Sequence, residues 1–284
     1  MAREYIARDP RTGERIGAKP KGARKGVGIA ALSPDSGPWQ RLESHEILPL
    51  ANGESGKIEI LADGKTWLLG RIDGVKALAK VPEKDVERAY DSLVDALEDD
   101  FPDVRIAALK TLPSFSLRRQ GILLHCLSDR LQDDEDSVRE EAMTCLKKVA
   151  PLFPSGCEEI LRRELRDTRK DHRGNAFEAL KLASREWPEV GCLHLDELIR
   201  EEEADLRIRG SMILRTIASK GGAEAWDLIG WSLQDEEVQV RRNASKTLTI
   251  LADVEPRVAV ILVESSIGED DRQIRGSVIK ALTP

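Results

Sequence analysis

The sequence predicts an all-α fold: a right-handed α-solenoid of about six to seven two-helix repeats, preceded by a basic arm rich in glycine and proline. Six arginines recur at intervals of 34, 34, 36, 32 and 34 residues, and an acid stands six positions before each one. A fixed period of this length is typical of solenoids, whose short units bury their apolar faces only against neighbouring units. The acid–arginine pairs are Asp99–Arg105, Asp133–Arg139, Asp167–Arg173, Glu203–Arg209, Asp235–Arg241 and Glu269–Arg275.

Each arginine opens an apolar stripe that predicts the second helix of its unit. In Val104-Arg105-x-x-Ala108-x-x-x-Leu112 the small and apolar residues lie four apart, on one face of a helix. A second apolar-periodic stretch precedes each acid and predicts the first helix. These stretches are Val86 to Leu97, Leu117 to Leu131, Glu159 to Leu165, Leu193 to Ile199, Ala225 to Leu233 and Val258 to Ile267.

The acid of each pair belongs to the short turn between the two helices. Its carboxylate can accept hydrogen bonds from free amides at the start of the second helix, where the helix dipole favours negative charge. The arginine is expected to reach this acid or its counterpart in the next unit. The pairs are therefore predicted to be structural staples, and Pro113, Pro151, Pro188 and Pro256 mark the ends of second helices.

The acid–arginine spacing and the V-R-x-x-A-x-x-x-L line resemble HEAT repeats, particularly the short bacterial and archaeal type also found in phycobilisome-lyase-like proteins. The resemblance covers about residues 84 to 284. It implies a helical solenoid with a concave groove lined by second helices. It says little about function, because HEAT proteins include scaffolds, transport receptors, chaperones and a few enzymes.

Three segments follow from these patterns: a flexible or loosely ordered basic arm at 1–55, a capping segment at 56–82 and the solenoid at 83–284. The first 26 residues carry eight basic residues against three acids, whereas the whole chain has a net charge of −7. Residues 56–82 have two interpretations. Arg71 to Leu78 follows the repeat pattern and predicts a degenerate end repeat, whereas Lys57 to Leu61 and Thr66 to Leu69 around Asp63-Gly64 predict a β-hairpin.

The composition indicates neither membrane insertion nor a cofactor. No apolar run approaches the length of a bilayer span and the first residues lack a signal-peptide core, so we expect a cytoplasmic protein. The four cysteines have no close paired spacing, so they are expected to be buried small residues rather than metal ligands. No cofactor, metal site or small-molecule substrate is predicted.

A recurring small-polar pair after the arginine is the candidate binding site. It consists of Gly174-Asn175, Gly210-Ser211, Arg242-Asn243 and Gly276-Ser277. Glycine inside a helix costs up to about 1 kcal/mol relative to alanine, so its recurrence calls for a reason. One reason is close packing between units. The other is a shallow polar track for a partner in the groove, with Arg15, Lys19, Lys21, Arg24 and Lys25 of the arm as a second contact.

These observations favour a non-catalytic scaffold or adaptor that binds a protein or peptide. The alternative is a nucleic-acid-associated protein that grips phosphates through its arm. A minor alternative is an enzyme, such as a HEAT-like DNA glycosylase using Trp187, Trp226, Trp231 and Asp227, or a lyase-type enzyme. An acidic solenoid disfavours the glycosylase because it repels phosphate.

Overall fold

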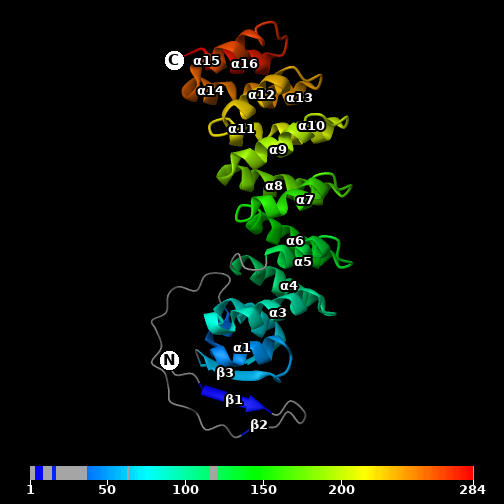
Figure 1. Ribbon diagram of the computed structural model, residues 1–284, viewed down its shortest axis with the longest axis vertical. Helices are drawn as coiled ribbons and strands as arrows, with labels where there is room; N and C mark the ends of the chain where they lie inside the picture. Colours follow the sequence, from blue (N-terminus) through cyan, green and yellow to red (C-terminus); the bar gives the residue numbers. More distant parts are fainter. Residues whose placement is uncertain (1–3, 9–14, 17–36, 63, 116–119, 284) are drawn as a thin grey trace. The chain divides into compact units, whose positions relative to one another are not determined.

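The computed structural model of the protein describes residues 4–8, 15–16, 37–62, 64–115 and 120–283. The chain forms two compact units, residues 1–145 and 146–284, and Figure 1 shows the helices of each unit as successive antiparallel hairpins. Among the described residues, no helix is both long and apolar enough to cross a membrane. The arm residues Lys19, Lys21, Arg24 and Lys25 lie outside the described residues.

The first unit begins with a small antiparallel sheet and continues as helical hairpins. The sheet order is β2-β1-β3-β4, with Tyr5 opposite Ile60 and Ile60 opposite Trp67. The strands are β1 Glu4–Arg8, β2 Arg15–Ile16, β3 Ile58–Ala62 and β4 Lys65–Leu69. The α-helices are α1 Ser44–Ala51, α2 Arg71–Ala77, α3 Val86–Leu97, α4 Pro102–Thr111, α5 Gln120–Arg130 and α6 Asp136–Val149. Helix α6 continues past residue 145, where the two units divide. The 3-10 helices are η1 Pro38–Arg41, η2 Leu78–Lys80, η3 Glu83–Asp85 and η4 Leu112–Ser114.

Residues 56–82 combine both elements that the sequence suggested. The β3–β4 hairpin takes the place of a first helix, and α2 takes the place of a second helix with Arg71 in the arginine position. Within the segment predicted to be a flexible or loosely ordered arm, residues 1–55, the structure places the 3-10 helix η1 and the helix α1. Helix α1 carries the buried residues Ile47 and Leu50, and β1 pairs with β3. The buried side chains of α1, which a helix-repeat pattern does not report, hold residues 44–51 in the core.

The second unit contains four two-helix repeats in order along the chain (Figure 1). The first helices are α7 Pro154–Glu164, α9 Pro188–Leu198, α12 Gly222–Leu233 and α15 Pro256–Glu264. The second helices are α8 Lys170–Glu186, α10 Ala204–Ser211 with α11 Leu214–Ile217, α13 Val238–Ser245 with α14 Leu248–Val254, and α16 Arg272–Ala281. Pro154, Pro188 and Pro256 each occupy the first turn of a first helix, where a missing amide hydrogen costs nothing.

Two of these second helices are interrupted at the same position, and serine accounts for it. Ser211 and Ser245 each donate a side-chain hydrogen bond to the carbonyl three residues earlier, at 2.6 Å and 3.0 Å. Such bonds compete with the helical ladder and bend helices. The corresponding residue of α8 is Phe177, which is buried, and α8 runs unbroken for 17 residues. The serines therefore divide α10 from α11 and α13 from α14.

Candidate binding surface and the repeated arginines

Three of the repeated arginines, Arg105, Arg207 and Arg241, bond to their own turn through main-chain carbonyls and to the next repeat through a carboxylate. Arg105 donates from Nη1 to the carbonyl oxygens of Asp99 and Asp100, at 2.7 and 3.1 Å. Its Nη2 donates to Asp133 Oδ1 of the following repeat at 2.8 Å. That acid also accepts the amide of Glu135 at 3.1 Å, which ties down the turn. One guanidinium therefore joins two consecutive turns.

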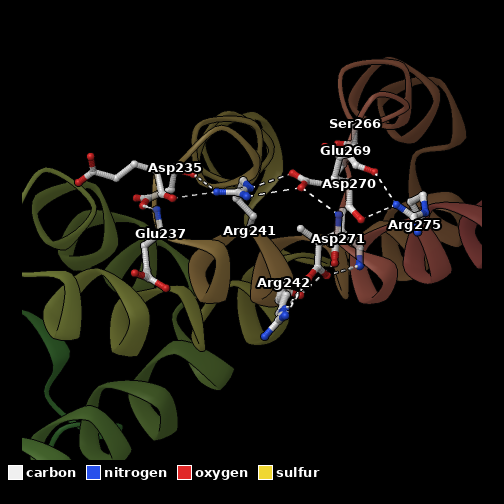
Figure 2. Close-up of polar contacts among 12 residues, drawn as sticks. Asp235, Glu237, Arg241, Arg242, Ser266, Glu269, Asp270, Asp271 and Arg275 are labelled. Atoms are coloured by element: carbon white, nitrogen blue, oxygen red, sulfur yellow. Dashed lines mark hydrogen bonds and ion pairs between the residues drawn. The ribbon is translucent and has the colours of Figure 1, made fainter.

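Figure 2 shows the same arrangement in the second unit, where Arg241 lies between two turns. Its Nη1 donates to the carbonyls of Asp235 and Glu236 at 2.8 and 2.9 Å, and its Nε donates to Glu269 Oε2 at 2.8 Å. The hydrogen bonds from Arg241 hold the pKa of Glu269 below its usual value. Beside it, Arg242 lowers the pKa of Asp271 to about 2 through a 2.7 Å bond.

The register of the fourth pair must be corrected from Glu203–Arg209 to Glu201–Arg207. Arg207, which is 6% exposed, donates to the carbonyls of Glu201 and Glu202 and to the carboxylate of Asp235. Arg209 instead pairs with Asp205 in its own helix, at 3.0 Å. The arginines are therefore spaced by 34 residues at every step: Arg71, Arg105, Arg139, Arg173, Arg207, Arg241 and Arg275.

The remaining arginines of the series have varied carboxylate partners. Arg71 reaches Asp99, 28 residues later, at 2.5 Å. Arg173 reaches Glu203 at 3.4 Å and Asp205 at 3.0 Å. Asp167 binds Arg169 at 2.5 Å, and Arg139 pairs with Asp136. Arg275 donates to the main-chain carbonyls of Glu269 and Asp270.

The corrected register also changes the interpretation of the small-polar track. Gly210 moves to the alanine position, three residues after the arginine, where it is buried. A Cβ atom there would lie 3.1 Å from Leu198 Cβ and 3.3 Å from Leu195 Cδ1 of α9. Gly174 and Gly276 lie one residue after the arginine and leave more room: a Cβ would meet only Arg209 Nη1 at 3.7 Å in the first case and nothing within 4 Å in the second.

The polar members of the track mostly connect neighbouring repeats. Asn243 donates from Nδ2 to Ser211 Oγ at 2.9 Å, and Ser211 is 1% exposed. Asn175 accepts a 2.6 Å bond from Lys147 Nζ. Ser277 donates to the carbonyl of Gln273 in its own helix at 3.2 Å. Asn243, Ser211 and Asn175 therefore satisfy each other or a neighbouring side chain, which leaves less of the track open to a partner.

These contacts give opposite expectations for the glycines. We expect Gly174→Ala and Gly276→Ala each to raise the free energy of unfolding by up to about 1 kcal/mol, through better helix propensity in open space. Gly210→Ala should be less favourable than Gly174→Ala by about 1 kcal/mol or more, because its methyl group presses on two leucines. Urea titration of the three single variants measures this order. Equal effects at all three positions would contradict the packing role of Gly210.

A different set of side chains on the second helices of residues 146–284 is open to solvent. Met212 is 56% exposed, and Arg215, Lys246 and Lys280 are exposed and form no ion pair with the described part of the chain. Met212, Lys246 and Lys280 share one repeat position, five residues after the arginine, and Arg215 is three residues beyond Met212. We call Met212, Arg215, Lys246 and Lys280 the Met–basic strip. Sequence reasoning missed this strip because its register was two residues off at Met212.

Buried cysteines and histidines do not form a reactive centre. Burial raises the pKa of Cys157 to about 12 and that of Cys192 to about 11, so both thiols stay protonated at neutral pH. Burial lowers the pKa of His194 to about 4, which keeps its imidazole neutral. These groups are core residues with little nucleophilic character.

One group of side chains has metal-ligand composition, namely Glu164, Asp167 and His172, whose donor atoms lie within 4.8 Å of one another. Two arginines already occupy the carboxylates. Arg163 donates to Glu164 at 2.8 Å, and Arg169 donates to Asp167 at 2.9 Å from Nε. The two guanidinium charges oppose a cation, so this group fits an internal charge cluster better than a metal site.

The tryptophans considered for base recognition are engaged in the fold. Trp187 donates from its indole nitrogen to the carbonyl of Pro151 at 2.9 Å. The guanidinium of Arg200 lies 5.1 Å from the centre of the Trp231 ring, a cation–π contact. Arg15, the remaining arm residue of the candidate site, lies in β2 opposite Arg8.

Comparison with known proteins identifies the fold. No protein-family model matches the sequence, and no curated protein matches it. Among solved structures, Mini spindles TOG3 of Drosophila melanogaster is 16% identical, with 66% of this chain and 92% of that chain covered and a TM-score of 0.52. The archaeal HEAT-like repeats protein of Thermococcus onnurineus is 14% identical, with 84% and 95% covered and a TM-score of 0.46.

A third similar structure is a much longer protein. The karyopherin Kap121p, bound to the extreme C-terminus of the protein phosphatase Cdc14p, is 15% identical with a TM-score of 0.47. The match covers 75% of this chain and 27% of the karyopherin, so the chain spans about a quarter of that protein. Of these three structures TOG3 has a TM-score above 0.5, and at 16% identity its likeness supports the helical-repeat fold alone.

Proposed function

We propose that this HEAT-like repeat chain is a non-catalytic adaptor that holds an acidic, partly apolar segment of a partner protein on its second-helix face. The observation that carries the proposal is the Met–basic strip. An exposed methionine beside three cations without carboxylate partners is unusual in a chain whose other arginines are mostly paired with acids. A basic area also stands out because the chain has a net charge of −7.

The strip offers the two kinds of contact that a short peptide uses. Met212 is flexible and polarisable, and exposed methionines adapt to apolar side chains of different shapes. Arg215 lies three residues from Met212, which places both on one side of the helical turn. In the next repeat Lys246 occupies the position that Met212 holds in this one, and the two helices α10 and α13 are in contact. A peptide in which carboxylates flank an apolar side chain would match the arrangement of Met212 beside Arg215 and Lys246.

Nucleic acid is the second candidate, since three cations can also contact phosphates. Met212 favours a peptide, because its apolar thioether offers nothing to a phosphate backbone. The basic arm, with Arg15, Lys19, Lys21, Arg24 and Lys25, remains a proposed second contact for either partner.

The test compares two charge reversals of equal size in the full chain. Arg215→Glu with Lys246→Glu removes two cations of the strip, whereas Lys220→Glu with Arg257→Glu changes two exposed cations at the turn before α12 and on α15. The probes are fluorescent peptide pools of Asp/Glu with Leu, Met or Phe, a basic peptide pool and a single-stranded oligonucleotide. We expect the acidic apolar pool to bind and the first variant to weaken that binding about tenfold or more, with the second near wild type.

Preferential binding of the oligonucleotide would overturn the peptide proposal. Equal losses in both double variants would also overturn it, because the effect would then reflect net charge rather than the strip. Met212→Ser provides a separate check on the apolar contact, because it removes the thioether without adding charge. This variant should weaken the binding of the acidic apolar peptide pool. It should leave the unfolding midpoint in urea nearly unchanged, because the side chain of residue 212 is exposed.

A further inference from the structure

One repeat position carries a different kind of exposed side chain in three consecutive repeats of the second unit. The position lies five residues after the repeated arginine, and its occupants are Glu178, Met212 and Lys246. All three side chains are exposed. Each of these repeats is followed by another one, formed by α9 and α10, by α12 and α13, and by α15 and α16. This position is therefore open to solvent inside the series of repeats.

The three side chains follow an order of charge: negative, apolar, positive. We call Glu178, Met212 and Lys246 the charge-ordered row. Glu178 pairs with Lys181 at 3.4 Å, but the two side chains are 54% and 32% exposed, and exposed pairs of this kind contribute little. Arg215 adds a second positive charge one helical turn from Met212. The two ends of the row therefore differ in charge, so a partner can be recognised by the order of its residues as well as by its composition.

The spacing of the helices sets the spacing that a partner must have. Helix α8 contacts α11, and α10 contacts α13, so the second helices of neighbouring repeats pack side by side. The axes of packed helices lie about 8–10 Å apart. An extended chain advances about 3.3 Å per residue, so about three of its residues span one step of the row.

We infer that the partner segment lies extended across the row and presents, at three-residue steps, a basic residue to Glu178, an apolar residue to Met212 and an acidic residue to Lys246. The inference rests on the proposed function and adds the order of residues in the segment. A second acid next to the apolar residue faces Arg215. A helical segment matches the row less well, because helices dock through several apolar residues at i, i+3, i+4 and i+7, whereas the row offers a single apolar side chain.

The first experiment tests the spacing with fluorescent peptides and the full chain. The ordered peptide carries lysine, leucine and glutamate at three-residue steps, with aspartate directly after the leucine and serine elsewhere. A second peptide has the same order in the opposite chain direction, because side chains alone do not set that direction. We expect one of the two to bind about tenfold or more tightly than a peptide of the same composition with two-residue steps.

Failure of both ordered peptides would overturn the inference. Binding of the acidic apolar peptide pool would then still support the proposed function, whereas loss of all peptide binding would overturn both.

The second experiment tests the order of charge at its negative end. Glu178→Lys makes the surface more basic, yet it should weaken the better ordered peptide about fivefold or more, because it opposes the lysine of that peptide. An acidic pool without lysine should bind this variant at least as well as wild type. Glu186→Lys makes the same charge change at an exposed position at the end of α8 and should leave binding near wild type.

Exchanged charges then fix which residues meet. An ordered peptide with glutamate in place of its lysine should restore binding to Glu178→Lys but not to Lys246→Glu. A peptide with lysine in place of its glutamate should restore binding to Lys246→Glu alone. All variants should keep the urea midpoint of wild type, since the replaced side chains are exposed. Tighter binding of the ordered peptide by Glu178→Lys, or equal rescue of both variants by either peptide, would overturn the inferred order.

Discussion

Replacing Arg207 by alanine should lower the free energy of unfolding by about 3 kcal/mol. The change leaves Asp235, which is 9% exposed at its side chain, without its charged partner, and it removes the bonds to the carbonyls of Glu201 and Glu202. Breaking a buried pair by removing one partner typically costs about 3–5 kcal/mol. We take the lower end because Glu237 still donates its amide to Asp235.

The control is Arg209→Ala, two residues away in the same helix. Arg209 is about one-third exposed and pairs with Asp205, which keeps a bond from Arg173. We expect its loss to cost under about 1 kcal/mol. Urea titration of both variants gives the difference directly. If Arg209→Ala proved the more damaging change, the corrected register would be wrong and the 36- and 32-residue intervals would be real.

A second large effect is expected at Gly74, which lies three residues after Arg71, the position that Ala108 holds after Arg105. A Cβ atom on Gly74 would lie 2.4 Å from the amide nitrogen of Ala51 and 2.7 Å from the carbonyl carbon of Leu50. Both are main-chain atoms of α1, which packs against the helix α2 that carries Gly74, so no side-chain rotation relieves the clash. We expect Gly74→Ala to destabilise the protein by about 3 kcal/mol, at the upper end for overpacking.

The matched control is Gly121→Ala in α5, where a Cβ would meet nothing within 4 Å. This change should be neutral or stabilising by up to about 1 kcal/mol. Thermal unfolding followed by circular dichroism distinguishes the two. A Gly74→Ala variant as stable as wild type would mean that α1 and α2 pack less closely than the structure has them.

The repeat architecture was predictable because period and chemistry coincide at each arginine. The slip at one repeat came from an ambiguity in the local pattern. Leu206-Arg207-Ile208-Arg209 contains an apolar residue followed by arginine twice, and both Glu201 and Glu203 are acids. Only the requirement of a constant 34-residue step, or the bonds of Arg207, chooses between them. The β1–β3 pairing joins residues more than 50 positions apart, which no local pattern reports.

The candidate site was harder to predict for a related physical reason. Glycine and asparagine at a recurring position look alike in sequence whether they bind a partner or a neighbouring repeat. The structure shows Asn243 on Ser211 and Asn175 on Lys147. Exposure, which decides what a partner can reach, depends on helix packing. Met212 and Arg215 follow a helix break set by Ser211, and their position on the surface becomes clear only with that break in place.

The constant step of 34 residues has a consequence for how a chain of this kind can change length over generations. Arg207 bonds to two carbonyls of its own turn and to an acid 28 residues onward, and Arg105 and Arg241 reach their acids at the same offset. A duplication or deletion of one whole period inside the repeats preserves that offset, since the next acid arrives at the same distance. A gain or loss of any other size separates the arginine from its acid and shifts leucines out of the core. Selection on such a gene would tolerate changes in whole repeats and remove the others.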